Sequence, residues 1–195
     1  MKMPAKIAVI LILFSGFLQA QSPQDGAASR MDEGRKLFAS SVDDEEDLET
    51  ARQVFTRIRK EDASLRGRAM VYLGALDIVA AKHTFWPHNK SSLVKRGLKK
   101  MEKGLRVAPK DIEARFIHGA ICYQLPFFFG CGDDVERDFA LITSLLNTPS
   151  QPCDTVILRD MQDFIDEEDV LTESERNRIR KLIVKRRAEF GRESK

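Results

Sequence analysis

Apolar residues recur along most of this chain with the spacing of an amphipathic helix. Between residues 48 and 58 they fall at every third or fourth position, on one face of a helix. The same spacing returns in six later segments, at about 69–81, 93–105, 112–121, 135–146, 156–165 and 179–183. After residue 29 no run alternates apolar and polar residues as a half-buried strand does. The pattern therefore predicts an all-α fold.

Helix ends are marked by residues that cap or interrupt helices. Thr172 precedes Glu175 by three positions, which predicts a capping box at the start of the last helix. Asp133 or Asp134 is expected to cap the helix over 135–146. Pro126 cannot continue the helix that precedes it, because proline lacks the backbone N–H that a helix interior requires.

Two helix pairs resemble each other in sequence. The second helix of each pair carries a Gly-Ala step, at 74–75 and again at 119–120. The first helices match with a shift of one residue, which sets Ala51, Phe55 and Ile58 against Gly97, Met101 and Gly104. Self-similar spacing in this range is typical of stacked helical hairpins, in which each hairpin buries its apolar face against a neighbour.

These positions resemble the tetratricopeptide-repeat (TPR) family. Its pattern places a small residue, then a large aromatic residue four positions on, then a small or aliphatic residue, then a proline before the next hairpin. Ala51, Phe55 and Ile58 follow that order, as do the residues from Gly97 to Pro109. The resemblance covers about residues 45–147 and implies stacked antiparallel hairpins that bind a protein or peptide. The period exceeds the family's roughly thirty-four residues, and the excess lies in Ala80–Asn89, so a compact TPR-like domain is implied rather than a regular superhelix.

Length and composition fit a single globular domain. The chain has 195 residues, of which 43% are hydrophobic and 32% charged. Its formal net charge of +2 is too small to steer it toward nucleic acid. It contains no Gly-rich phosphate loop, GxSxG or HExxH motif, so we expect neither an enzyme nor a cofactor.

Residues 1–20 have the layout of a secretory signal peptide. Two lysines precede an apolar run over Ile7–Leu18, and the small residue Ala20 follows. Twelve residues rise about 18 Å as a helix, short of the roughly 30 Å of a bilayer core. We expect cleavage after Ala20 and export to the periplasm or medium, the alternative being an uncleaved anchor. The mature chain would then be a flexible lead over 21–29 and a helical domain over 30–195 without a membrane span.

The cysteines are few and widely spaced. Export places Cys122, Cys131 and Cys153 where oxidation is permitted, and an odd number allows at most one internal bridge. We expect Cys122 to pair with Cys131, because a turn between them brings the chain back. Neither a CxxC pair nor an i, i+4 spacing between His83 and His88 is present, so we expect no metal site.

Three phenylalanines, Phe127, Phe128 and Phe129, stand in a row between Pro126 and Gly130. Gly130 is suited to a turn with positive φ. Burying a phenylalanine is worth about 2–3 kcal/mol, so we expect at least two of the three to plug the seam between adjacent hairpins. The alternatives are an aromatic-lined pocket or groove and a membrane wedge.

Phe85 and Trp86 occupy the matching place at the end of the earlier hairpin, on the same predicted edge of the stack. Trp86 is favoured as a core anchor, but aromatic and arginine side chains also dominate binding hot spots. The candidate binding residues are therefore Phe85, Trp86, Arg115, Phe127 and Phe128. The leading hypothesis is an exported protein–protein interaction module, and the alternative is a periplasmic carrier of a small apolar ligand, associated with solute uptake.

Overall fold

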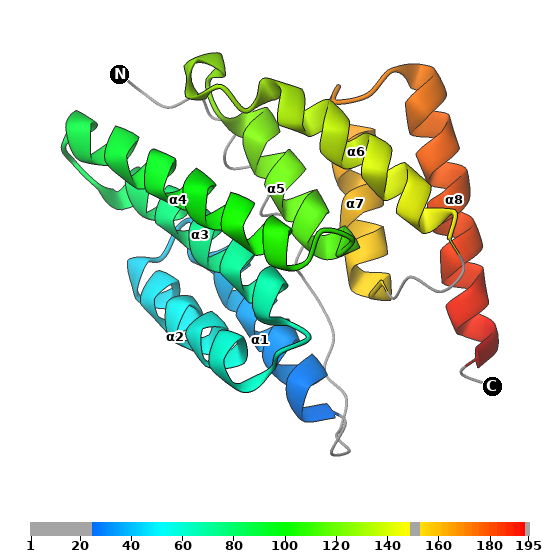
Figure 1. The fold of residues 1–195 in the computed structure, drawn as a ribbon, viewed down its shortest axis with the longest axis horizontal. Helices are drawn as coiled ribbons and strands as arrows, with labels where there is room; N and C mark the ends of the chain where they lie inside the picture. The colour runs from blue at the N-terminus through cyan, green and yellow to red at the C-terminus, as the bar shows by residue number, and fades with distance from the viewer. Residues whose placement is uncertain (1–24, 149–152, 194–195) are drawn as a thin grey trace. The chain divides into compact units, whose positions relative to one another are not determined.

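The computed structural model describes residues 25–148 and 153–193, and the expected signal peptide over residues 1–20 lies outside them. The described residues form eight α-helices and one 3-10 turn, with no strand among them (Figure 1). The elements are α1 Asp25–Ser40, α2 Glu45–Glu61, α3 Arg66–His83, α4 Pro87–Val107, α5 Ile112–Gln124, η2 Phe127–Phe129, α6 Gly132–Leu146, α7 Thr155–Glu167 and α8 Glu173–Glu193. The prediction of an all-α fold is confirmed.

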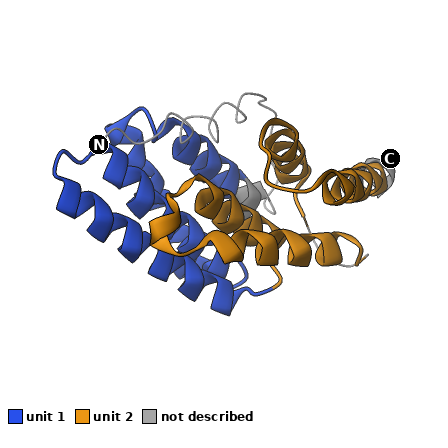
Figure 2. Ribbon diagram, turned by 90° about the horizontal axis from the view of Figure 1, so that it is seen from above, with its two compact units in different colours: residues 1–109 blue, residues 110–195 orange. Residues whose placement is uncertain are grey.

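The chain divides between Pro109 and Lys110 into two compact units (Figure 2). The first unit contains α1 to α4 and the second contains α5 to α8. The helices that the repeat would join as its second hairpin, α4 and α5, thus belong to different units. The single domain expected over residues 30–195 stays a prediction.

In the first unit each helix packs against the next along the chain, α1 on α2, α2 on α3 and α3 on α4 (Figure 1). The predicted apolar face of α2 is buried, with Phe55 at its centre. The ring of Phe55 stacks on Tyr72 of α3 with centroids 4.3 Å apart, and Phe38 of α1 meets Tyr72 edge-on at 5.2 Å. Three consecutive helices therefore share one aromatic cluster.

Helices α3 and α4 approach each other through two pairs of glycines. A Cβ atom on Gly74 would lie 2.6 Å from the carbonyl oxygen of Gly97, and one on Gly67 would lie 2.9 Å from that of Gly104. Real Cβ atoms do not approach backbone atoms so closely. Only glycine at these positions lets the two backbones meet.

The second unit is organised around Phe164 of α7. Its ring lies against Phe116, Tyr123 and Phe139, with centroid distances of 5.7, 5.9 and 6.1 Å. Helix α5 packs on α6, and α8 packs on both α6 and α7. Gly119 of α5 faces the following helix, as Gly74 does, but a Cβ there would meet side chains of α6 at 3.3 Å rather than backbone.

Several predicted helix ends are confirmed. Helix α5 ends at Gln124, before Pro126, and Gly130 has a φ of 75°. The capping box at Thr172 is formed, because its backbone N–H donates to Glu175 at 3.0 Å and that of Glu175 donates back to the Thr172 hydroxyl at 3.4 Å.

Two boundaries differ from expectation. Helix α1 begins at Asp25, within the segment expected as a flexible lead over 21–29, because the alanines there favour a helix. Helix α6 begins at Gly132, so Asp133 and Asp134 lie in its first turn rather than at its cap. The left-handed turn at Gly130 redirects the chain early enough for the helix to start before them. In the described part of the chain, no helix combines the length and apolar character needed to cross a bilayer.

Candidate functional site

Phe85 and Trp86 lie exposed in the connection between α3 and α4. Phe85 is 83% exposed and Trp86 is 59% exposed, and their ring centroids are 5.4 Å apart in an edge-on contact. The expectation that Trp86 is a core anchor is therefore wrong. The connection has extended backbone at Thr84 and Trp86, so these rings lie outside the packed faces of both helices.

Phe127 and Phe128 are also on the surface, at 91% and 58% exposure, while Phe129 is half-buried. The expectation that at least two of the three are buried is wrong. The three residues form a single 3-10 turn, in which successive side chains point about 120° apart. In this turn only Phe129 is partly covered, while its two neighbours point into solvent. Both candidate aromatic pairs, Phe85 with Trp86 and Phe127 with Phe128, are thus exposed, one pair in each unit. Their placement on the same edge of a helical stack stays a prediction.

Helix α4, which begins directly after Trp86, carries seven lysine and arginine side chains and one acidic side chain. Lys95, Lys99 and Lys103 are exposed and follow one another at one-turn intervals. Like charges at this i, i+4 spacing destabilise a helix by a few tenths of a kcal/mol per pair. The chain as a whole has a net charge of only +2, so this helix concentrates its positive charge.

Other cations of α4 point inward to a buried carboxylate on α3. Asp77 is fully buried and accepts hydrogen bonds from Lys100 at 2.5 Å, from Arg96 at 3.1 Å and from Arg52 of α2 at 2.8 Å. Burial alone would raise the pKa of Asp77, but these three donors outweigh it and lower that pKa below its ordinary value. The network ties three helices together and leaves the exposed lysines of α4 to face solvent.

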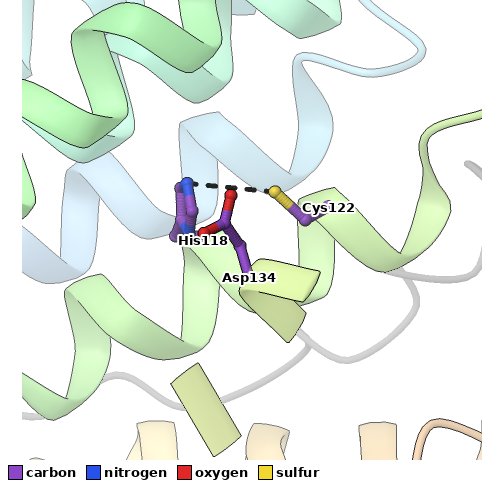
Figure 3. A group of neighbouring side chains, drawn as sticks. All are labelled: His118, Cys122 and Asp134. Carbon is purple, nitrogen blue, oxygen red and sulfur yellow. Dashed lines mark hydrogen bonds between the residues drawn. The ribbon is translucent and has the colours of Figure 1, made fainter. Parts of the chain in front are cut away.

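A cluster of metal-ligating side chains lies inside the second unit. Figure 3 shows His118 and Cys122 of α5 and Asp134 of α6 directed toward one another. One ligand atom from each of the three lies within 4.8 Å of the other two. His118 Nε2 is 3.8 Å from Cys122 Sγ, and both residues are buried.

The other nitrogen of His118 is held by Asp138, the residue one turn after Asp134. His118 Nδ1 lies 2.6 Å from Asp138 Oδ2, and Arg115 donates to Asp138 Oδ1 at 2.8 Å. Because a carboxylate accepts hydrogen bonds, Nδ1 is the donor, and Nε2 is the nitrogen that faces the thiol. Arg115, a candidate binding residue, therefore lies in this network rather than in an aromatic surface.

All three cysteines are buried, and no disulfide joins them in the described part of the chain. Cys131 lies beside Cys122, and its thiol donates to the Cys122 carbonyl oxygen at 3.9 Å. The neighbouring Cys131 thiol, burial, and the charges of Asp134 and Asp138 all raise the pKa of the Cys122 thiol. The turn does bring Cys122 and Cys131 together, and their oxidation to a disulfide stays a prediction.

Sequence reasoning missed this cluster for an identifiable reason. It tested the spacing of His83 and His88 but not that of His118 and Cys122, which are four residues apart on one helix. That i, i+4 spacing was a readable signal. The contribution of Asp134 could not be read from the sequence, because it depends on how the turn at Gly130 returns the chain onto α5.

Comparison of the chain with protein-family models, with curated proteins and with solved structures gave no match. The TPR resemblance therefore stays a prediction that rests on the small and aromatic positions between residues 45 and 147.

Proposed function

We propose that the protein is an exported, TPR-like interaction module that binds an acidic, partly apolar segment of a partner protein in the bacterial envelope. The observation that carries this proposal is the exposure of Phe85 and Trp86 immediately before the strongly basic helix α4. Phe127 and Phe128 provide a second exposed aromatic pair, on the other unit.

The exposed aromatic rings and the basic side chains of α4 are of the kinds that are common at binding hot spots. Aromatic rings supply most of the contact energy at such sites, and complementary charges speed association and exclude wrong partners. Three exposed lysines at one-turn intervals favour an acidic partner, because an anionic segment would relieve their mutual repulsion. Nucleic acid is a less suitable occupant, since the chain's net charge of +2 provides no broad basic field.

A periplasmic small-molecule carrier is the alternative. A small-molecule site usually buries about 70–90% of its ligand in a concave pocket. Rings as exposed as Phe85, Trp86 and Phe127 favour an open contact surface over the walls of such a pocket.

The test is binding of a fluorescein-labelled synthetic peptide rich in Glu, with Leu and Phe at helical spacing, followed by anisotropy. We expect saturable binding that weakens as salt rises from about 50 to 500 mM, because the charges are screened. The variant Trp86→Ala and the triple variant Lys95→Glu/Lys99→Glu/Lys103→Glu should each bind at least about tenfold more weakly.

The matched control is Lys181→Glu/Lys185→Glu, which changes two exposed lysines of α8. It should bind the peptide as the wild type does. An equal loss of peptide affinity in the α4 and α8 lysine variants would show that the binding is non-specific electrostatic attraction. Tighter binding of a single-stranded oligonucleotide or of anionic vesicles than of the peptide would contradict a protein partner.

A further inference from the structure

The buried cluster between α5 and α6 is separate from the aromatic surfaces and has a chemistry of its own. We propose that His118, Cys122 and Asp134, completed by Cys131, form a binding site for a transition-metal cation of the zinc type. Neither the interaction module nor the carrier requires such a site, so the two proposals stand or fall separately.

The ligand atoms are already close to the spacing that such a cation requires. Zinc binds sulfur at about 2.3 Å and nitrogen at about 2.0 Å in a tetrahedron, which places two ligand atoms roughly 3.5 Å apart. His118 Nε2 and Cys122 Sγ are 3.8 Å apart, and the Asp134 carboxylate lies within 4.8 Å of both. Small side-chain rotations would close this set around an ion.

Cys131, the residue that precedes α6, would supply the fourth ligand. It is buried, and its thiol donates to the Cys122 carbonyl oxygen at 3.9 Å. Its Sγ lies outside the group of three ligand atoms that are within 4.8 Å of one another, so it has to turn toward them when the ion binds. Two ligands thus come from one turn of α5, and two come from the start of α6. The φ of 75° at Gly130 is what folds the second pair back onto the first.

The surroundings of His118 match those of a metal-ligating imidazole. Such a histidine almost always donates its other ring N–H to a carboxylate or carbonyl, which fixes the tautomer and raises the basicity of the ligating nitrogen. Asp138 fills that position at 2.6 Å, and Arg115 orients Asp138 by donating to its other oxygen at 2.8 Å. The imidazole therefore presents Nε2, rather than Nδ1, to Cys122 and Asp134.

The charge balance is compatible with a divalent cation. Asp134 is ion-paired with Arg137 and Asp138 with Arg115, so each of the two carboxylates already faces a guanidinium group. Binding of a divalent cation releases the two thiol protons and leaves two thiolates and one carboxylate as ligands. Affinity should consequently rise with pH.

The donor set selects the class of cation. Two sulfurs, one imidazole nitrogen and one carboxylate oxygen suit zinc and, as a spectroscopic substitute, Co²⁺. Calcium and magnesium take oxygen ligands almost exclusively and fit this set poorly. A disulfide between Cys122 and Cys131 would remove two of the ligands, so the site exists only while both thiols are reduced.

The first experiment titrates the reduced full-length mature protein with Co²⁺. We expect one equivalent to produce a thiolate-to-cobalt charge-transfer band in the near ultraviolet, which Zn²⁺ then abolishes by displacement. Cys122→Ser should weaken Co²⁺ binding by more than about 100-fold, beyond what loss of an outer-sphere partner costs. Cys153→Ser is the matched control, because Cys153 is also a buried thiol but lies outside the cluster, and it should leave the band unchanged.

A second measurement uses the wild type alone and so does not depend on any variant folding. One equivalent of Zn²⁺ should slow alkylation of Cys122 and Cys131 by N-ethylmaleimide at least about tenfold, while Cys153 reacts at its metal-free rate. Co²⁺ binding without the charge-transfer band would overturn the proposal. So would equal slowing of all three cysteines, which would mean general stabilisation rather than ligation.

Discussion

Gly74 of α3 and Gly97 of α4 face each other so closely that neither can carry a side chain. A Cβ on Gly97 would lie 2.5 Å from the carbonyl oxygen of Gly74, and the reverse distance is 2.6 Å. Gly67 and Gly104 repeat the contact seven residues away along each helix. This glycine seam holds α4, and with it the exposed lysines, against the rest of the first unit.

Gly97→Ala is expected to destabilise the protein by about 1–3 kcal/mol. Overpacking against backbone cannot be relieved by a side-chain rotation, and it outweighs the gain of up to about 1 kcal/mol in helix propensity. Urea unfolding followed by circular dichroism measures the difference.

The control for that substitution is Gly132→Ala, where an added Cβ meets nothing within 4 Å. It should be neutral or stabilising by up to about 1 kcal/mol. If Gly97→Ala proves as harmless as Gly132→Ala, α3 and α4 are not in backbone contact.

Asp77→Asn is expected to cost about 2–4 kcal/mol at neutral pH, because three cations would lose a buried charged acceptor. The pKa of Asp77 is lowered in the folded state, so its stabilising effect is complete above the unfolded value of about 4 and is lost as pH falls through the folded value. The difference in unfolding free energy between wild type and variant should therefore be constant at neutral pH and shrink below about pH 4.

Asp43→Asn provides the comparison, since Asp43 pairs with Lys82 at 2.8 Å on the surface. Exposed pairs contribute about 0–1 kcal/mol, so this variant should unfold nearly as the wild type does. A wild-type-like Asp77→Asn protein, or a difference that persists unchanged to pH 2, would contradict the network.

Phe127→Ala and Phe128→Ala should each change the unfolding free energy by less than about 0.5 kcal/mol, because both rings are mostly in water. Phe139→Ala, in which a buried ring is truncated, should cost about 3–5 kcal/mol. Thermal or urea unfolding of the three variants decides the matter. A loss of several kcal/mol in unfolding free energy on truncating Phe127 or Phe128 would mean that these rings are buried, and would contradict their exposure.

The helices were predictable because their apolar spacing is determined locally. Ala51, Phe55 and Ile58 recur on one face of α2, and that face alone can be buried. The capping box of Thr172 and the helix end before Pro126 likewise depend on neighbours in sequence.

Placement of the connecting residues was less predictable. The hydrophobic character of Trp86 and Phe127 suggested burial, yet exposure depends on where a short connection lies relative to surfaces formed by distant helices. The partnership of His118 with Asp134 and Asp138 depends in the same way on how α6 returns onto α5. Sequence spacing predicts which side chains share a face of one helix. It does not predict which residues of the next helix a turn brings against that face.

The emission of Trp86 tests the central claim of an exposed binding surface most directly, because it is the chain's one tryptophan. In the free protein we predict emission close to that of tryptophan in water and efficient quenching by acrylamide. Addition of the acidic peptide should shift the emission to shorter wavelength and protect it from acrylamide. A free protein whose emission is already blue-shifted and resists acrylamide would place Trp86 inside the molecule and contradict the account.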